Sequence, residues 1–464
     1  MKKFLKWGGI AASIPVAIAS VCAALLYFPP FQDWASKKAA AYASEKTGME
    51  VSVEKVRLEF PLKLGMEGVK VIKQNDSLPQ VKDTIADFKK VVADVKLGPL
   101  FKKRVEIDQL EFQDAKVNTT DFIDDTRVKA TIGKLSVKSH GIDLGANTIR
   151  IDDAQMEDAK IDVALSDTVP DDTTQTDVPW RIHVDNLHIK KSDVHVTLPG
   201  DSQEIQAHIG EATAKEGDID LKGKKYKVGK LDFQDGRVKY DDKNKTHARS
   251  GFDSNHIEAR DVNVSMEDIS FETPIKLSAK LKKASLKEKS GIELKDMSGN
   301  LSMDDKTLHI NDGSIKTPDS SIKADFDMDL NTFDIKDAGK LNANIHASIG
   351  KQDLMKYMGD TPAGFRKKWP NYPLSIDGVV KGNMERLDFK GLQMKLPTAF
   401  NLKASGHAEH LDNLDKLKAD VTFDGKAHDV GFIKELLPND VKKDINIPKN
   451  IALNGNVKAN GNRY

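Results

Sequence analysis

The sequence contains a single cysteine, Cys22, among 464 residues. The rest of the chain can therefore form no disulfide and no thiolate metal site, even in an oxidising compartment. Basic and acidic side chains balance at 71 each, so no net charge favours nucleic acid as a partner. Aromatic residues make up only 6% and charged residues 31%. This composition suits one long sheet with one wetted face better than a two-sided sandwich.

Motifs for catalysis and cofactor binding are also missing. No glycine-rich phosphate loop precedes a helix, and no Gly-x-Ser-x-Gly elbow is present. The most metal-like groups are His407 and His410 with Asp412, and then His183, His188 and His195. Neither group has third and fourth ligands at a suitable spacing, and exposed strand or turn positions explain both. We therefore assign no catalytic, cofactor-binding or metal-ligating residue and predict that the protein is not an enzyme.

The longest apolar run lies near the N-terminus, where residues 7–28 carry no charge. About 22 residues at 1.5 Å each span roughly 33 Å, which is enough to cross a bilayer core. Three lysines precede the run, so the positive-inside tendency predicts a cytoplasmic tip (residues 1–6), a transmembrane helix (residues 7–28) and a chain that continues outside the cytoplasm. Two alternatives are a cleaved signal peptide and lipid attachment at Cys22.

A second helix is predicted over residues 29–48. Pro29 and Pro30 end the first helix, and Gly48 is a suitable residue after the end of the second. Apolar side chains recur at helical spacing between these points and should line one side. The helix is expected either to rest on the outer headgroups as a juxtamembrane helix, with Trp34 at the interface, or to cap the first strands.

One short pattern recurs four times between Val105 and Tyr240. The copies read VEIDQLEFQDAKV, IRIDDAQMEDAKI, IHVDNLHIKKSDV and YKVGKLDFQDGRV, at spacings of roughly 44, 33 and 44 residues. A period of two is typical of β-strands with one apolar face, and repeats at this interval indicate an array rather than one closed core. Asp235-Gly236 favours a hairpin turn that leads into a return strand, and a looser fifth copy begins at Ile257.

Residues 166–179, SDTVPDDTTQTDVP, interrupt this pattern. The segment is acidic, rich in threonine and without an apolar face, so it predicts a mobile loop. Its aspartates match no calcium-binding loop spacing, and a solvated linker explains them better.

A longer repeat occupies the last third of the chain. LNANIHASI from Leu341 matches LKADVTFDG from Leu417, and LSIDGVVKGN from Leu374 matches IALNGNVKAN from Ile451. Each unit is predicted to be several strands followed by a short amphipathic helix and a proline-bounded crossing. We therefore divide the strands into N-terminal β-repeats (residues 49–270) and a second set of β-repeats (residues 271–464) whose last copy is incomplete. We expect either a longer natural chain or a partner that supplies the missing edge.

Together these elements resemble the TamB family of AsmA-like envelope proteins. The resemblance rests on the N-terminal anchor, on PPFQDWASKKAAAYASEKTGMEVSVEKVRLEFPLKLGMEGVKV, on LGPLFKKRVEIDQLEFQDAKVNT, and on the recurrent IDGVVKGN and LNGNVKAN. It covers nearly the whole chain, through patterned strands rather than a catalytic signature. TamB proteins are typically much longer, and their C-terminal domain is not recognisable here.

The resemblance implies a mainly β fold, in which a transmembrane helix precedes an elongated, curled, repeating β-sheet with a few short helices. Such proteins are anchored in the inner membrane of Gram-negative bacteria and bridge the periplasm, with an apolar concave face that carries lipid acyl chains. The implied function is phospholipid transport between inner and outer membranes, assembly of outer-membrane proteins, or both. The implied partner is an outer-membrane β-barrel assembly factor, contacted through the C-terminal part that is not recognisable here.

The residues themselves also support an apolar groove. A single long sheet must shelter its apolar face, because each Å² of apolar surface left in water costs roughly 25 cal/mol of free energy. If the sheet curls, the alternating apolar residues of the four copies share one lining: Val105, Ile107, Leu110, Phe112, Ile149, Ile151, Met156, Ile182, Val184, Leu187, Ile189, Val228, Leu231 and Phe233. The same residues could instead form an ordinary packed core.

Two functions are consistent with the sequence. The first is a lipid conduit with phospholipids as its cargo. The alternative is a structural or protein-binding periplasmic scaffold that docks a partner by β-strand addition at its last strand. A continuous apolar trough favours the conduit, whereas a closed and filled core favours the scaffold.

Overall fold

The structure is a computed structural model. It describes residues 34, 36–38, 40–41, 44–45, 49–59, 63–74, 80, 82–95, 107–119, 126–143, 147–165, 180–198, 200, 202–273, 275–332, 339–383, 385–410, 416–438, 442 and 444–460. The predicted cytoplasmic tip, transmembrane helix and acidic loop lie outside these residues, as does Val105. Across the described part of the chain, no helix is long and apolar enough to cross a membrane.

Part of the second predicted helix is described, and its residues 34, 36–38, 40–41 and 44–45 are helical. The helix meets the first strand, because the Ser44 hydroxyl accepts a hydrogen bond of 2.8 Å from the backbone N–H of Val51. Trp34 is 56% exposed.

The chain is mainly β, with a few short helices, and it divides into two compact units, Met1–Ser202 and Gln203–Tyr464. The boundary that the sequence repeats suggested, between residues 270 and 271, falls near the end of one strand of the second unit, His256–Glu272. Each unit is described below by itself.

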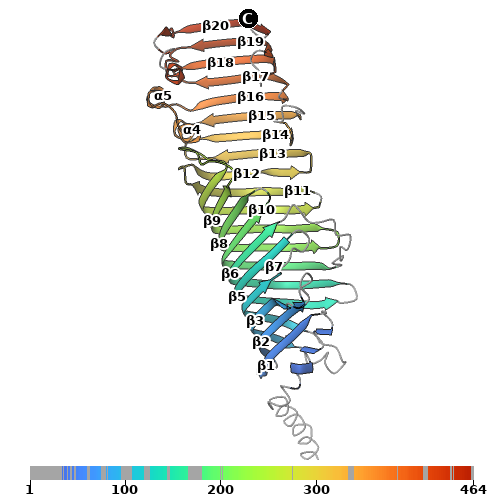
Figure 1. The fold of residues 1–464 in the computed structure, drawn as a ribbon. Helices are drawn as coiled ribbons and strands as arrows, with labels where there is room; N and C mark the ends of the chain where they lie inside the picture. The colour runs from blue at the N-terminus through green and yellow to red at the C-terminus, as the bar shows by residue number, and fades with distance from the viewer. Residues whose placement is uncertain are drawn as a thin grey trace, which may run out of the picture. The chain divides into compact units, whose positions relative to one another are not determined.

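Among the residues that the structure describes, the first unit holds seven strands in one sheet, paired in chain order. Neighbours are antiparallel except for the last two, which are parallel. The strands are β1 (Glu50–Glu59), β2 (Lys63–Gln74), β3 (Lys82–Val95), β4 (Ile107–Asn118), β5 (Thr126–Asp143), β6 (Thr148–Leu165) and β7 (Arg181–Leu198). In Figure 1 the strands of this unit run obliquely on one side and nearly horizontally on the other, so the sheet is curled.

The parallel pair β6 and β7 consists of two copies of the sequence pattern lying side by side. Ile149 opposes Ile182, and Met156 opposes Ile189, so the register equals the repeat offset. Two copies that run in the same direction place apolar residues against apolar residues along the whole strand, which fixes the register.

Every copy of the pattern contains a bend inside one strand. Asp114, Asp158 and Lys191 have φ values of 49°, 54° and 45°, in the left-handed region, at the polar position that precedes a small residue. Such a residue bends the strand and shifts its side-chain alternation by one. In β4, the half-buried Phe112 lies before the bend and the buried Ala115 lies after it.

The prediction of a hairpin at Asp235-Gly236 is therefore wrong. Both residues lie in the middle of one strand, Lys225–Asp242, and Gly236 pairs with Val262 of the next strand. Asp235 has a φ of 52°, the same conformation that a hairpin turn uses. Here a single left-handed residue bends the strand without reversing it.

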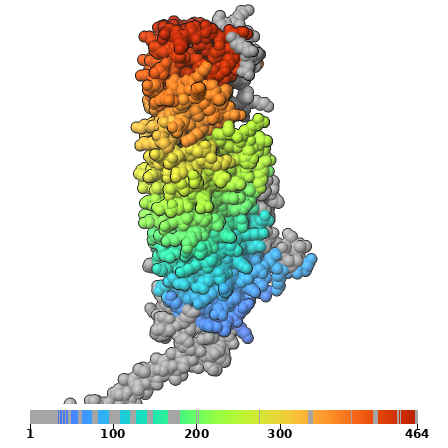
Figure 2. Space-filling model, turned by 90° about the vertical axis from the view of Figure 1, so that its left-hand side faces the viewer, coloured from blue at the N-terminus to red at the C-terminus, as the bar shows by residue number. Residues whose placement is uncertain are grey.

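In its described residues, the second unit holds thirteen strands, also paired in chain order and all antiparallel. The colours of this unit follow one another in bands in Figure 2, as this pairing requires. The strands are β8 (Gln203–Asp220), β9 (Lys225–Asp242), β10 (His256–Glu272), β11 (Lys276–Glu288), β12 (Glu293–Met303), β13 (Thr307–Lys316), β14 (Ser321–Asp329), β15 (Leu341–Ile349), β16 (Leu374–Gly382), β17 (Arg386–Leu396), β18 (Phe400–Glu409), β19 (Lys418–Ala427) and β20 (Ile451–Asn460).

Short helices interrupt the second unit at equivalent points of the longer repeat. The helices α4 (Lys351–Met358) and α5 (Ala363–Lys368) connect β15 to β16, and η2 (Ile433–Leu436) lies between β19 and β20. This arrangement of strand, short helix and strand matches the prediction. The helices meet the sheet in one apolar cluster: Phe365, Trp369, Leu374, Leu396, Ala399 and Phe432.

Candidate functional site

One face of the first unit carries an unbroken row of apolar side chains. Residues that oppose one another in a sheet point to the same face, so the register identifies the row directly. One residue from each strand takes part: Val56, Met66, Val91, Phe112, Leu135, Met156 and Ile189. Val56 and Val91 are buried, and the others are half-buried.

A second apolar row runs beside the first. On each strand its member lies two residues away from the member of the first row. It consists of Leu64, Ala93, Leu110, Val137, Ala154 and Leu187. The apolar face also continues across the bend, because the rings of Phe88 and Phe112 lie on opposite sides of it with centroids 5.2 Å apart. The bend therefore keeps apolar residues from both halves of the strands together.

The predicted lining residues of the first unit that the structure describes take four positions in this arrangement. The first row contains Phe112, Met156 and Ile189, and the second row contains Leu110 and Leu187. Two further apolar pairs oppose each other nearer the start of β6 and β7, namely Ile149 with Ile182 and Ile151 with Val184. Ile107 begins β4 and opposes Val95.

The opposite face of β4 to β7 is polar. The row between the two apolar rows contains Glu111, Ser136, Gln155 and His188, and on β3 it continues through the buried Val92. The amide nitrogen of Gln109 donates to Ser136 Oγ at 3.1 Å and to Glu111 Oε1 at 2.9 Å.

Ion pairs add to this polar surface at the bend. Lys89 Nζ lies 3.0 Å from Asp114 Oδ2, and Lys191 Nζ lies 3.1 Å from Glu157 Oε1. The hydrogen bond to Glu157 raises the pKa of Lys191.

The second unit repeats the arrangement across all thirteen strands. Its longest row contains Ala212, Phe233, Val264, Ala284, Met297, Ile315, Ile322, Ala347, Ile376, Met394, Leu402, Gly425 and Leu453. The other two predicted lining residues of this unit oppose apolar partners, Leu231 with Met266 and Val228 with Ile269. A polar face alternates with the row here too, for example where His346 Nδ1 lies 3.0 Å from Asp377 Oδ1.

Neighbouring strands of the sheet provide most of the packing among the described elements. In the second unit, Ile376 of the row also packs against the helical cluster that contains Phe365, Trp369 and Phe432. Most members of the rows remain partly exposed to solvent.

Titratable groups do not converge on the apolar faces in the described residues. On β7, His183, His188 and His195 oppose Arg150, Gln155 and Asp162, so each meets a different partner on β6. At about 3.3 Å per residue, these histidines lie roughly 16 and 23 Å apart along the strand.

The other histidine group is also spread out. His407 opposes Asp388 on one side and Asp420 on the other, in the polar row of its strands. His410 follows the end of β18, and Asp412 lies outside the described residues.

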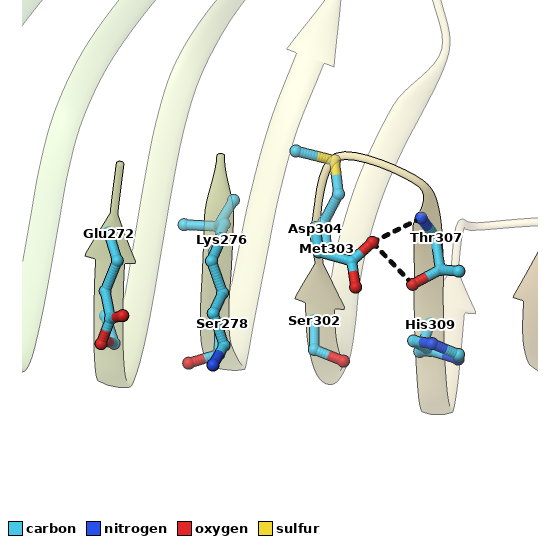
Figure 3. Close-up of a pocket in the computed structure, with 10 residues that line it drawn as sticks. Glu272, Lys276, Ser278, Ser302, Met303, Asp304, Thr307 and His309 are labelled. Atoms are coloured by element: carbon cyan, nitrogen blue, oxygen red, sulfur yellow. Dashed lines mark hydrogen bonds between the residues drawn. The ribbon is translucent and has the colours of Figure 1, made fainter. Parts of the chain in front are cut away.

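A small polar hollow of about 190 Å³ lies at the ends of β10 to β13 in the second unit (Figure 3). Asp304 Oδ1 accepts hydrogen bonds from the Thr307 N–H at 2.6 Å and the Thr307 hydroxyl at 2.9 Å. The N–H of Lys306 also donates to this carboxylate, and these bonds lower the pKa of Asp304. The arrangement is that of a turn whose aspartate satisfies backbone donors.

The apolar residues of the strands that do not carry the pattern were not predicted. In the two rows of the first unit they are Val56, Leu64, Met66, Val91, Ala93, Leu135 and Val137. Their own alternation, as in KLSVK of β5, carries the same signal. Without the register they could not be assigned to one face.

Comparisons with known proteins add no identification, because no family model matches the chain and no curated protein matches its sequence.

Proposed function

We propose that the protein carries phospholipids between the inner and outer membranes of a Gram-negative envelope, with acyl chains on the apolar face of its curled sheets. The observation that carries this proposal is the unbroken apolar row on one face of each unit, most members of which remain partly exposed to solvent. A role in assembly of outer-membrane proteins is part of the same proposal. The resemblance to the TamB family and the apolar segment at residues 7–28 support the location.

The dimensions of the first unit suit an acyl chain. Seven strands at about 4.8 Å each place the ends of the row roughly 29 Å apart, close to the thickness of a whole bilayer core. Each CH₂ kept out of water contributes about 0.8 kcal/mol. A chain lying along the row therefore retains much of the free energy that holds a lipid in a membrane, while the headgroup stays in water.

The charge distribution supports the same assignment. Ion pairs and hydrogen bonds gather on the polar face, and the lining residues are uncharged. A charge in the row would face a lipid tail without a partner, which is strongly unfavourable.

The alternative is a scaffold that docks a partner by strand addition, and one observation favours it. β20 pairs with β19 through all ten of its residues, and no register within the described chain pairs its other edge. Leu453 and Val457 on this strand are 50% and 45% exposed. An unpaired edge with exposed apolar side chains is a template for another strand.

The test of lipid carriage is to purify the full chain in mild detergent from a Gram-negative host and to measure bound phospholipid by native mass spectrometry. Two double variants separate the faces: Met156→Arg with Ile189→Arg in the apolar row, and Gln155→Arg with His188→Arg in the adjacent polar row. We expect the first to lose most of the lipid and the second to retain it.

The control variant carries the same added charge on the same two strands. It therefore shows how much of the bound phospholipid comes from the detergent extract or from lipid held around the N-terminal segment. Circular dichroism shows whether each variant keeps its strand content. A folded wild-type chain without phospholipid, or equal loss in both variants, contradicts the conduit and favours the scaffold.

A further inference from the structure

A carboxylate and two imidazoles come together in the second unit where β9 ends and β10 begins. Asp241 is near the end of β9 and His256 is the first residue of β10, and the two oppose each other in the register. His247 lies in the connection between these strands. One ligand atom from each of the three residues lies within 4.8 Å of the other two.

His256 is held with one ring nitrogen fixed and the other directed toward this group. Its side chain is buried, and Nδ1 lies 2.9 Å from Asp253 Oδ2. Asp253 is fixed in turn, because it accepts hydrogen bonds from the N–H groups of Ala248 at 2.8 Å and Asn255 at 3.1 Å. A carboxylate that accepts from one ring nitrogen of a histidine orients the other nitrogen as a metal ligand, as in many metal sites.

The spacing of the facing atoms suits a cation between them. His256 Nε2 lies 3.7 Å from Asp241 Oδ1, which is too long for a hydrogen bond. Two ligands that each lie about 2.0–2.1 Å from a tetrahedral metal ion are roughly 3.3 Å apart. A movement of a few tenths of an ångström therefore brings both atoms to bonding distance.

The third ligand lies beside the other two and has to turn its ring to coordinate the same ion. The ring of His247 stacks on that of His256, with centroids 3.7 Å apart and an angle of 29° between the planes. His247 is exposed on the connection, so its ring can rotate without disturbing the sheet. Two imidazole nitrogens and one carboxylate oxygen suit a divalent ion of intermediate hardness such as Zn²⁺. Calcium and magnesium prefer oxygen ligands alone.

We propose that Asp241, His247 and His256 form a binding site for a divalent d-block cation, with Zn²⁺ as the first candidate, and that Asp253 positions His256. Three protein ligands leave a fourth tetrahedral position for water or another ligand. The bound ion would fasten the connection between β9 and β10 to the end of the sheet. The proposal is independent of lipid carriage.

The experiment uses the full chain, purified without a polyhistidine tag and freed of metal with a chelator. Zn²⁺ alone is titrated in by isothermal calorimetry, and Co²⁺ is used as a visible probe of tetrahedral coordination. We expect one ion per chain with a Kd of about 1 µM or tighter. Asp241→Asn and His247→Gln should each weaken binding at least about tenfold.

The matched control is His346→Gln, which removes an exposed histidine that also pairs with an aspartate, in another part of the same unit. It should bind Zn²⁺ like the wild type and give the same Co²⁺ spectrum. Because His247 is exposed, its variant keeps the fold, which thermal unfolding checks. The proposal is overturned if the wild type binds no Zn²⁺ at about 100 µM, or if His247→Gln and His346→Gln bind it equally.

Discussion

Gly210 of β8 faces Asp235 at the bend of β9, and the two residues depend on each other. Asp235 has a φ of 52°, and a Cβ on Gly210 would lie 2.8 Å from both the Cβ and the carbonyl oxygen of Asp235. The first unit repeats this relationship, where a Cβ on Gly133 would lie 3.1 Å from the Cβ of Asp158. The left-handed residue that bends one strand therefore calls for a glycine on its neighbour.

This contact predicts that Gly210→Ala destabilises the protein by about 1–3 kcal/mol, because the methyl group meets backbone that must shift. Urea unfolding followed by circular dichroism measures the change. Gly455→Ala is the control, since a Cβ there meets no heavy atom within 4 Å. Equal effects of the two substitutions would contradict the proposed packing of the bend.

The conformation of Asp235 predicts opposite effects of two substitutions at that position. Asp235→Gly should be neutral or stabilising by about 1 kcal/mol, because glycine adopts a positive φ without strain. Asp235→Val should destabilise, because a β-branched residue rarely adopts this conformation. The same urea titration measures both variants. If Asp235→Val were the more stable variant, the left-handed bend would be refuted.

The apolar cluster beside the helices of the second unit should be its most sensitive packing site. Leu396 is fully buried there, with Trp369 and Phe432 in the same cluster. Leu396→Ala should lower the free energy of unfolding by about 2–5 kcal/mol, because it leaves a cavity. Leu453→Ala on β20 should change it much less, since that side chain is 50% exposed. A reversed order of the two effects would contradict the assigned burial.

The ion pairs between Glu435 of η2 and two lysines should make the free energy of unfolding depend on pH. Lys368 Nζ lies 2.5 Å from Glu435 Oε1, Lys442 bonds the other oxygen, and together they lower the pKa of Glu435 to about 2. A lowered folded-state pKa contributes stability that is present above the unfolded value of about 4.3 and is lost as pH falls toward 2.

Glu435→Gln should therefore be less stable than the wild type at pH 6, and the difference should shrink between about pH 4.5 and 2. Urea unfolding followed by circular dichroism at each pH measures the difference. Glu385→Gln, at an exposed position, should follow the wild type at every pH. A difference between Glu435→Gln and the wild type that stays constant with pH would show that the ion pairs do not stabilise the fold.

The sequence predicted the strands better than it predicted their partners. Each of the four pattern copies coincides with one strand, β4, β6, β7 or β9, because alternation is a local property. The fifth copy, from Ile257, coincides with β10. The parallel register of β6 and β7 joins residues 33 positions apart and depends on both copies meeting.

The errors have a physical cause of the same kind. Asp235-Gly236 was predicted as a hairpin because a bend and a turn both use a positive φ, and only long-range pairing distinguishes them. The cluster of Asp241, His247 and His256 was missed because its residues are brought together by the register of two strands. Completing the apolar rows also required the register, which no single strand contains.

The most direct test of lipid carriage is site-specific photo-crosslinking in living cells. A photoreactive benzophenone amino acid replaces Met156 in the apolar row or the neighbouring Gln155 in the polar row, and cross-linked phospholipid is detected after irradiation. Lipid carriage predicts phospholipid adducts at Met156, and likewise at Phe233 in the second unit, with few at Gln155. Absence of adducts at Met156 and Phe233, or equal labelling at Gln155, would contradict it.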